Sequence, residues 1–439
     1  MFNLFSKRRA NDANNDANLD EKNAVGFEYL SKSDFYFDSA CQTLRPGSVI
    51  AAEVEYYHKF NSCGHRVKYK WGQETDKRVE ECRTNLLKLA GKTAHDYTIA
   101  FGLNTTAGIN TVLMQLPPHG FKAIITTEIE HNSVFLPSLV YSQKHNIPRL
   151  ILERTADGSL KYDLKDLDQA IVILNSTSNI DGRELLNVAQ LATDIHARGG
   201  ILLLDACQTL SHHPELLQKV DFDAIFGSGH KMYGPSVGFS IIKKSLLLRL
   251  DCYLIGGSTV SQVQAESYEL IQDETEIYSR IEPGLQNYAG IIGLNAAIKW
   301  RQNFKFELAK IADKLTQSDF KISELGFKPT QILNASEYEK LLTYYLSHKI
   351  ANVPNIHILN SEPSPIVSLY STKDDMDAHK LAMYLSEVGI MCRSGYHCCH
   401  YYLKAKLDLP PLFRISLALN NSLQQIDYLV DKLAFLTKT

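Results

Sequence analysis

Short apolar runs alternate with polar, helix-like stretches from about residue 98 to residue 245. Runs of strand length occupy positions 122–126, 150–152, 170–174, 201–205, 224–227 and 238–242. Short buried-type runs separated by helical patterns are typical of strands joined by crossover helices. The alternation predicts a mainly parallel sheet with helices on both faces, which is an α/β fold. In such sheets ligands bind beyond the carboxyl ends of the strands.

The C-terminal part follows a different pattern. A helical spacing of apolar residues, closed by a glycine, is formed by Ala378, Leu381, Leu385, Val388 and Gly389. Strand-like runs follow at 390–393 and 412–419, and Ser422 with Gln425 has the spacing of a capping box for a last helix. These elements predict a smaller α+β domain at 300–439, after a large domain at 46–299.

Composition narrows the class of protein. The 439 residues are ample for two domains, and 44% hydrophobic with 22% charged residues is ordinary for a globular chain. A net charge of −3 gives no basic footprint for nucleic acid, and no apolar run approaches the roughly 20 residues that span a bilayer. Eight cysteines without regular spacing argue for a reducing compartment, hence the cytoplasm. Residues 1–25, polar and low in complexity over 10–22, are expected to form a disordered tail.

Two charged residues fall at the ends of consecutive strand-like runs. Asp205 closes the run 201–205, and Lys231 follows the run 224–227 after a short turn. Pyridoxal phosphate (PLP) requires an amine that condenses with its aldehyde and an acid that keeps its ring nitrogen protonated. Each residue alone would more often be a solvated surface group. Their placement at neighbouring strand ends indicates a PLP site.

The segment around this lysine carries a family resemblance. Residues 228–235, Ser-Gly-His-Lys-Met-Tyr-Gly-Pro, resemble the PLP-lysine motif of class V aminotransferases, and within that superfamily the cysteine desulfurases and selenocysteine lyases. The similarity runs from about Phe35 to about Val430. It implies the type I fold of PLP-dependent transferases, PLP as cofactor, a homodimer, and a segment 26–45 that packs with the small domain.

The resemblance assigns the phosphate contacts of the cofactor. Thr105 and Thr106 stand at the start of a helix, where free N–H groups and the helix dipole favour an anion. Ser228 and His230 match the other phosphate contacts of the same subunit. From the residues alone, an ordinary threonine N-cap is the alternative.

Three further positions match groups around the ring. His131 matches the histidine that stacks on the pyridine ring and relays protons, while Asn179 and Gln208 match amides that bond the ring oxygen. A satisfied polar histidine and turn-forming amides are the alternatives here.

The chain departs from the family pattern in the segment 281–287, where Leu285 replaces a threonine that reaches the phosphate of the neighbouring subunit. Backbone amides of 256–258 could approach that phosphate instead. Ala107 replaces an acidic residue common in the close subgroup. The first departure leaves the cross-subunit phosphate contact open but not the dimer, and both departures are features that favour the alternative of another class V reaction.

A second segment resembles the sulfur-handling motif of the desulfurases. It reads Arg393-Ser394-Gly395-Tyr396-His397-Cys398-Cys399-His400. Cys398 is at the nucleophile position, and Tyr396 replaces a histidine. Positive charge from Arg393, His397 and His400 is expected to lower the thiol pKa from its free value of about 8.5. Cys399 either resolves a persulfide on Cys398 or packs.

The run 397–400 has two other interpretations. Zinc favours Cys and His, but four consecutive residues do not easily close a tetrahedron, so no metal is expected. A buried structural cysteine is the second alternative. The remaining cysteines are expected in strand-like or helical, structural contexts.

Arg414 matches the arginine that clamps the α-carboxylate of the substrate, and its planar fork suits a carboxylate. Arg393 is expected to assist, and Asn179 could touch the same carboxylate. The pair His65-Arg66 matches residues near the active-site mouth of the family.

The resemblance implies a PLP-dependent cysteine desulfurase that converts L-cysteine to L-alanine and leaves a persulfide on Cys398, with selenocysteine as a possible substrate. Lys231, Asp205, His131 and Cys398 would be its catalytic residues, and a sulfur-acceptor protein its partner. Another class V enzyme without a persulfide step (an aminotransferase, an epimerase or a C–S lyase) is the alternative. A non-catalytic scaffold is the third interpretation.

Overall fold

The computed structural model describes residues 26–438 except 32, 65–66, 312–313 and 316–318. The tail 1–25 and the pair His65-Arg66 therefore lie outside the described residues. A seven-stranded sheet forms the centre of the large domain, with strand order β2-β8-β7-β6-β5-β3-β4. These strands are β2 (Tyr97–Gly102), β3 (Ala123–Thr127), β4 (Arg149–Leu152), β5 (Ala170–Asn175), β6 (Ile201–Asp205), β7 (Ala224–Ser228) and β8 (Gly238–Lys243). Only β8 runs antiparallel to its neighbours in this sheet, so the prediction of a mainly parallel α/β sheet is confirmed.

Each of the six predicted strands forms, with ends shifted by at most one residue. The strand that the prediction lacked is β2, which pairs only with β8 at the edge of the sheet. Because β8 is antiparallel to both neighbours, β2 runs parallel to β7 and its carboxyl end joins the same edge.

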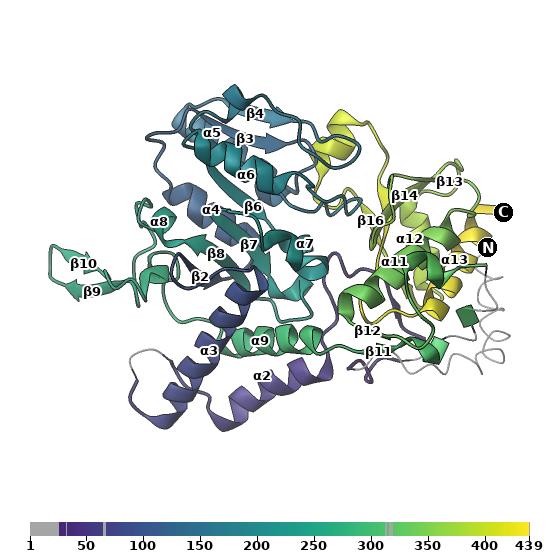
Figure 1. Ribbon diagram of the computed structural model, residues 1–439, viewed down its shortest axis with the longest axis horizontal. Helices are drawn as coiled ribbons and strands as arrows, with labels where there is room; N and C mark the ends of the chain where they lie inside the picture. Colours follow the sequence, from purple (N-terminus) through teal and green to yellow (C-terminus); the bar gives the residue numbers. More distant parts are fainter. Residues whose placement is uncertain (1–25, 32, 65–66, 312–313, 316–318, 439) are drawn as a thin grey trace.

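Helices cover both faces of the sheet (Figure 1). One face carries α3 (Lys70–Leu89), α6 (Val188–Ala197), α7 (Cys207–His212) and α9 (Tyr288–Gln302), and the other carries α4 (Thr105–Gln115), α5 (Asn132–His145) and α8 (Lys244–Leu247). The period of two along β6 divides its side chains between two cores: Leu202 and Leu204 pack on the first face, Ile201 and Leu203 on the second. Each fully buried leucine or isoleucine contributes about 1.5–3 kcal/mol.

A second, four-stranded antiparallel sheet organises the C-terminal part, in the order β13-β14-β17-β16. Its strands are β13 (Ile356–Ile358), β14 (Ile366–Ser371), β16 (Arg393–Gly395) and β17 (Leu412–Ser416), and its helices are α11 (Ala335–Ile350), α12 (Ala378–Ser386) and α13 (Leu423–Lys438). The N–H of Gln425 donates to Ser422 Oγ at 3.3 Å, which is one half of the predicted capping box.

Two predicted strand boundaries were wrong. The run 390–393 divides at Cys392 into β15 (Ile390–Met391), which pairs with β1 (Phe35–Tyr36), and β16, which pairs with β17. The run 412–419 ends as a strand at Ser416, and beyond it the N–H of Leu417 donates to Pro365 O. Both changes occur because distant segments supply the pairing partners.

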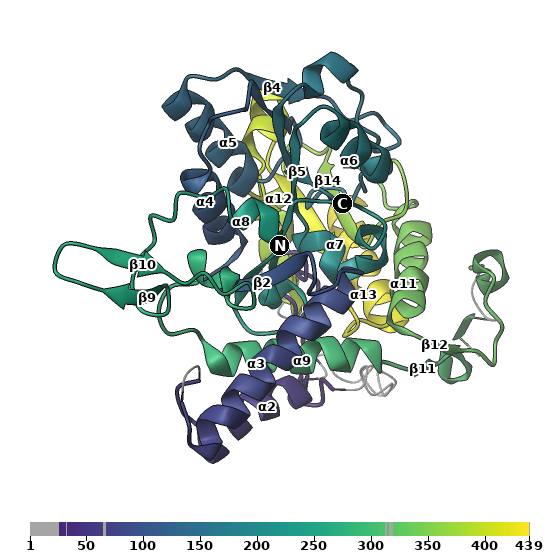
Figure 2. The ribbon, with the colours of Figure 1, turned by 60° about the vertical axis from the view of Figure 1, so that its left-hand side comes forward.

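The N-terminal segment contacts the C-terminal elements. β1 adds in parallel to β15, and Phe27, Phe35 and Phe37 share one apolar core with α11, α12 and α13. Figure 2 shows α9 lying against α2 (Gly47–Lys59) and α3, and Ala297 at its C-terminal end belongs to the core of the small domain. The domain boundaries at residues 46 and 300 stay a prediction.

The remaining elements are short. They are the strands β9 (Val260–Val263), β10 (Tyr268–Leu270), β11 (Phe306–Glu307) and β12 (Ile332–Leu333), the 3₁₀ turns at Leu164–Leu167, Pro214–Leu217, Gly229–Lys231, Ile277–Arg280, Leu308–Ile311 and Ile322–Leu325, and a π-helical segment at Tyr401–Lys406. The β9–β10 hairpin stands out from the large domain on the side opposite the C-terminal elements (Figure 1). Within the described part of the chain, every helix is too short or too polar to cross a membrane.

Candidate active site

The carboxyl ends of the parallel strands gather polar residues at one edge of the large sheet. Asn175, Asp205 and Ser228 close the neighbouring strands β5, β6 and β7, with Asn175 beside Asp205 and Asp205 beside Phe226 in the register. The loop after β3 leads to His131, and the loop after β2 leads to Thr105. Residues far apart in the sequence therefore meet at the edge where such sheets bind ligands.

Lys231 ends a short 3₁₀ turn that follows β7 directly. The turn needs Gly229, because a Cβ there would lie 2.6 Å from Pro235 O. The backbone carbonyl of Lys231 accepts a hydrogen bond from Ser211 Oγ, which leaves the side chain out of the structural contacts of the turn. Asp205 is buried at the neighbouring strand end, where its Oδ1 accepts the N–H of Cys207 at 3.1 Å.

The pKa of His131 depends on the charges of both Lys231 and Asp205. Burial and the positive charge of Lys231 together lower the pKa of His131 to about 4, although the charge of Asp205 opposes the shift. The imidazole is therefore neutral at neutral pH. Its Nδ1 lies 2.9 Å from Ser133 Oγ, and that hydroxyl lies 2.6 Å from Thr106 Oγ1. These contacts hold His131 Nδ1 beside the start of α5, and sequence reasoning missed Ser133 among them.

A second hydroxyl pair stands at the start of α4. Thr105 donates its N–H to Ser228 Oγ at 3.0 Å, and the two hydroxyls lie 2.9 Å apart. Asn104 caps the helix by accepting the N–H of Ala107. The predicted helix start at Thr105 is thus confirmed, and two threonines and a serine converge on a helix N-terminus that favours an anion.

His230 and Gln208 connect this edge to the N-terminal segment. The carbonyl of His230 accepts hydrogen bonds from Thr43 N and Oγ1, and burial lowers the pKa of its imidazole to about 4. Gln208 Nε2 donates to Ala40 O at 2.8 Å, while its Oε1 is buried without a hydrogen-bond partner among the described residues. An unsatisfied buried oxygen is costly in a finished core and ordinary in a binding site.

Arg414, predicted to hold the substrate carboxylate, is almost fully buried in β17. Its Nη1 donates to Asn179 O at 3.0 Å and its Nη2 to Asp38 Oδ1 at 3.2 Å. The second oxygen of Asp38 accepts Arg393 Nε at 3.0 Å. Sequence reasoning missed Asp38. Arg414 Nε remains buried without a partner in the described chain, so the guanidinium is only partly satisfied.

The predicted nucleophile lies on a strained loop. His397 and Cys398 adopt positive φ angles of 45° and 57°, a conformation that costs non-glycine residues free energy. The loop is tied to the start of α5, because Asn132 N donates to Cys398 O at 2.6 Å. A second hydrogen bond, from Asn179 Nδ2 to His397 O at 2.9 Å, ties the loop to the sheet edge where the predicted cofactor residues lie, here called the cofactor edge. The thiol of Cys398 is left exposed.

Cys399 differs from the exposed Cys398 in its burial and its hydrogen bonding. It is fully buried, and its thiol donates to Glu130 O at 3.0 Å. Burial raises the pKa of Cys399 well above its ordinary value, and the nearby Glu130 adds to the shift. Of the two roles considered for it, packing is the one that this environment favours.

The positive charge predicted for His397 beside the Cys398 thiol is absent. Burial lowers the pKa of His397 to about 3, helped by the positive charges of Arg414 and Arg393. His397 is therefore uncharged at neutral pH and does not contribute the positive charge predicted for it. Arg393 remains as a permanent charge, while His400 Nδ1 lies 3.2 Å from Asn132 Nδ2.

Acid should destabilise the protein through His397. An unfolded histidine titrates near its ordinary pKa of about 6.5, whereas the folded one titrates at about 3. The unfolded chain therefore binds more protons between these values, and stability present above about pH 6.5 is lost as the pH falls. We expect His397→Asn to reduce the loss of unfolding free energy between about pH 7 and pH 5 by about 1–2 kcal/mol in urea titrations. The exposed His58→Asn is the matched control, and an equal pH dependence in both variants would contradict the assignment.

The departures from the family pattern have clear positions. Leu285 is 73% exposed, and the adjacent Gly284 donates its N–H to Gly257 O at 2.8 Å, so the segments 256–258 and 281–287 lie together. Tyr396 is partly buried, with its ring 5.5 Å from that of His400. Ala107 is in the first turn of α4. Four other cysteines also differ from expectation, because they lie outside helices and strands: Cys41 in a turn, Cys63 in an exposed loop, Cys252 in a buried loop and Cys392 between β15 and β16.

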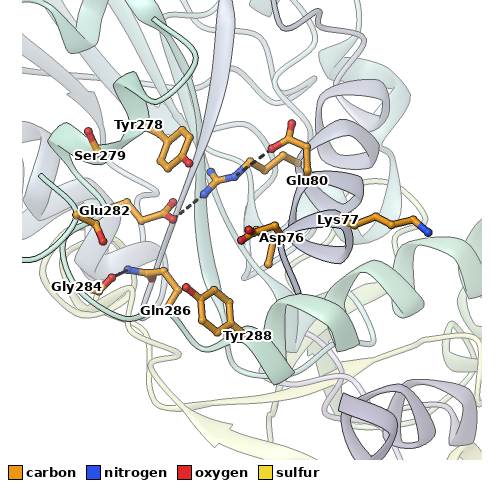
Figure 3. Close-up of a pocket in the computed structure, with 12 residues that line it drawn as sticks. Asp76, Lys77, Glu80, Tyr278, Ser279, Glu282, Gly284, Gln286 and Tyr288 are labelled. Atoms are coloured by element: carbon orange, nitrogen blue, oxygen red, sulfur yellow. Dashed lines mark hydrogen bonds and ion pairs between the residues drawn. The ribbon is translucent and has the colours of Figure 1, made fainter. Parts of the chain in front are cut away.

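A separate hollow of about 370 Å³ lies between α3 and the segment 278–288 (Figure 3). Its charged centre is already paired, because Arg83 contacts Glu282 at 2.7 Å and Glu80 at 3.9 Å. The residues lining it do not include Lys231, Asp205 or Arg414. It is therefore distinct from the site described above. Within the described residues, no group of three His, Cys, Asp or Glu side chains is arranged to hold a metal ion.

Known proteins share both the sequence pattern and the fold. The class V aminotransferase family matches residues 35–326 and 322–429. A cysteine desulfurase of Escherichia coli is 28% identical over 404 residues, which cover 90% of this chain and 91% of the relative. The apo structure of a cysteine desulfurase from Thermococcus onnurineus is 25% identical, with a TM-score of 0.77 over 94% of this chain and 96% of that one. The crystal structure of an Escherichia coli cysteine desulfurase has a TM-score of 0.76 at 24% identity, over 94% of this chain and 97% of that one.

The chain belongs to the class V aminotransferase family, and it is therefore a PLP-dependent enzyme with the type I fold. The residues at the sheet edge fit this cofactor. They offer an amine at Lys231, a carboxylate at Asp205, converging hydroxyls at a helix N-terminus, and the unsatisfied Oε1 of Gln208. When bound, PLP supplies an electron-accepting ring for chemistry at the carbon atoms of an amino acid.

Proposed function

We propose that this enzyme is a cysteine desulfurase that converts L-cysteine to L-alanine and leaves the sulfur on Cys398 as a persulfide. The observation that carries the proposal is the exposed thiol of Cys398 on a positive-φ loop that Asn179 and Asn132 anchor to the cofactor edge. The similarity to cysteine desulfurases over nine-tenths of the chain supports it. The balance is simple: cysteine and the Cys398 thiol give alanine and the Cys398 persulfide.

Each part of the site has a defined task in this proposal. Arg414 binds the α-carboxylate through the donors that Asp38 and Asn179 leave available. Lys231 Nζ moves protons at the α-carbon of the substrate. His131 remains neutral, which lets its ring lie against an aromatic surface and exchange a proton through Ser133 and Thr106. Asp205 supplies a buried carboxylate at the end of β6, next to the strand that leads to Lys231, and Ser228 with Thr105 offers hydroxyls to a phosphate.

Partners and substrate range form part of the proposal. We infer that a sulfur-acceptor protein takes the sulfur from Cys398, because the thiol is exposed. Selenocysteine as a second substrate rests on the resemblance to selenocysteine lyases alone. A homodimer is supported by large apolar side chains exposed between residues 253 and 285, namely Tyr253, Leu254, Ile255, Val263, Tyr268 and Leu285. The cytoplasmic location stays a prediction from the unpaired cysteines.

One assay tests the proposed reaction. The PLP-loaded protein is incubated with L-cysteine, with and without a reductant, and alanine, sulfide and protein-bound persulfide are measured. We expect alanine in both conditions. Without the reductant we expect persulfide on Cys398, and with the reductant we expect as much sulfide as alanine. Alanine without persulfide, or a keto acid instead of alanine, would favour another class V reaction.

A further inference from the structure

Two loops that carry predicted active-site residues are bound to each other. The loop between β3 and α5, residues 128–131 and here called the histidine loop, ends at His131, the residue that caps α5. The first N–H of α5 donates to Cys398 O at 2.6 Å, and the thiol of Cys399 donates to Glu130 O at 3.0 Å. A shift of the histidine loop would therefore move the Cys398 loop as well.

The side chain of Glu130 binds the histidine loop to the end of β5. It is buried, and its Oε2 accepts hydrogen bonds from Asn175 N at 2.7 Å and from Asn175 Nδ2 at 2.9 Å. Its Oε1 accepts the hydroxyl of Thr127 at 2.5 Å. Asn175 Nδ2 also donates to Ile129 O at 3.1 Å, and Asn175 pairs with the last residue of β6. One residue thus contacts the sheet edge with its carboxyl group and the Cys398 loop with its carbonyl.

These hydrogen bonds depend more on the reach of Glu130 than on its charge. Burial raises the pKa of Glu130 to about 7, although the charge of Arg154 opposes the rise. The neutral and the ionised carboxyl group are therefore close in free energy near neutral pH. Arg154 Nη2 lies 3.9 Å from Glu130 Oε1, beyond hydrogen-bond distance, and donates instead to Asn175 Oδ1 at 2.8 Å.

We propose that Glu130 is a positioning residue that holds His131 and Cys398 in one fixed arrangement, because it joins the histidine loop to β5 on one side and to the Cys398 loop on the other. This inference rests on the proposed function only in that Cys398 accepts the sulfur. Glu130 acts through the two loops and is not a catalytic residue. Loss of its hydrogen bonds slows sulfur transfer and spares substrate binding, because Arg414 belongs to β17 in the small sheet.

Two conservative variants separate reach from charge. Glu130→Asp keeps the charge and shortens the side chain by one methylene group, whereas Glu130→Gln keeps the reach and an oxygen for both N–H groups of Asn175. In the PLP-loaded protein with L-cysteine, we expect Glu130→Asp to lower kcat for alanine formation about tenfold or more, with KM within about twofold of the wild type, because small displacements of reacting groups are costly. Glu130→Gln should lose less than about threefold in kcat. The exposed Glu324→Asp is the matched control.

Amide hydrogen exchange tests the same hydrogen bonds without any reaction. In the PLP-loaded protein without cysteine, we expect Glu130→Asp to exchange about tenfold faster than the wild type in the segments 129–134 and 397–403 together, and at the wild-type rate in β13 and β14. Asn175→Ser removes the donor to Ile129 O and should accelerate the same two segments. It decides the question if Glu130→Asp does not fold.

Unchanged exchange in folded Glu130→Asp, or a larger loss of kcat in Glu130→Gln than in Glu130→Asp, would overturn the proposal. Faster exchange throughout the protein would overturn it too, because it would show a general loss of stability and no local coupling of the two loops. A wild-type protein that forms no alanine from L-cysteine, while its variants show the expected exchange, would refute only the proposed desulfurase function.

Discussion

Replacing Lys231 by alanine is expected to abolish alanine formation from L-cysteine, with a loss of at least about a thousandfold in kcat. The reason is that Lys231 is an amine in the turn that directly follows β7, the strand that pairs with the end of β6 at Asp205. Losing a positioned proton-transfer group alone costs about 10²–10⁴-fold. In the proposed function Lys231 would also hold the cofactor, so its removal would take away that attachment as well. The measurement is single-turnover alanine release, together with the visible absorbance of the bound cofactor.

The Lys231→Ala protein should nevertheless fold. Ser211 Oγ donates the hydrogen bond that holds the turn to the backbone carbonyl of Lys231, and Gly229 makes the close approach to Pro235. Neither contact involves the lysine side chain. The exposed Lys219→Ala is the matched control and should keep wild-type activity. Retention of more than a tenth of the wild-type rate by Lys231→Ala would show that the reacting amine is elsewhere.

The parts of this molecule that sequence could predict are those specified by local pattern. The buried runs that form β5, β6 and β7 are continuous and strongly apolar. Because these strands are parallel, Asp205 and the turn that carries Lys231 lie at the same edge of the sheet, independently of how the helices pack. The start of α4 at Thr105 also follows local chemistry, although the residue that caps it is Asn104 and not the threonine considered from the sequence. Local chemistry and global topology agree at these positions.

The features that sequence missed depend on contacts between distant segments. Asp38 and Arg414 are separated by 376 positions, and nothing in the turn around Asp38 indicates which cation it meets. The division of the run 390–393 depends on β1, which is more than 350 positions away. The neutral state of His397 depends on burial and on two arginines, of which Arg414 is on another strand. A motif assigns residue types to a site but leaves their charge states to the folded environment.

Substitutions of the two adjacent cysteines distinguish a residue that takes part in the reaction from one that only packs. Cys398→Ser should lose persulfide formation completely and alanine formation by about a hundredfold or more, because a hydroxyl at that position is a poor acceptor for sulfur. Since Cys398 is exposed and already holds a positive φ of 57°, serine adds no new strain and fills no new space. The measurement is the rate of alanine formation, with intact-protein mass to detect the added sulfur atom.

Cys399→Ala is the matched control, because it changes the next residue in a different environment. The buried thiol donates to Glu130 O, so its removal should lower the unfolding free energy by about 1–2 kcal/mol through a small cavity and a lost hydrogen bond. The folded Cys399→Ala protein should still form alanine and carry one added sulfur atom on Cys398. The opposite pattern, in which Cys398→Ser retains the wild-type rate and Cys399→Ala loses it, would require the buried thiol to reach the substrate, and the loop would have to open away from Asn132 and Asn179 for that to happen.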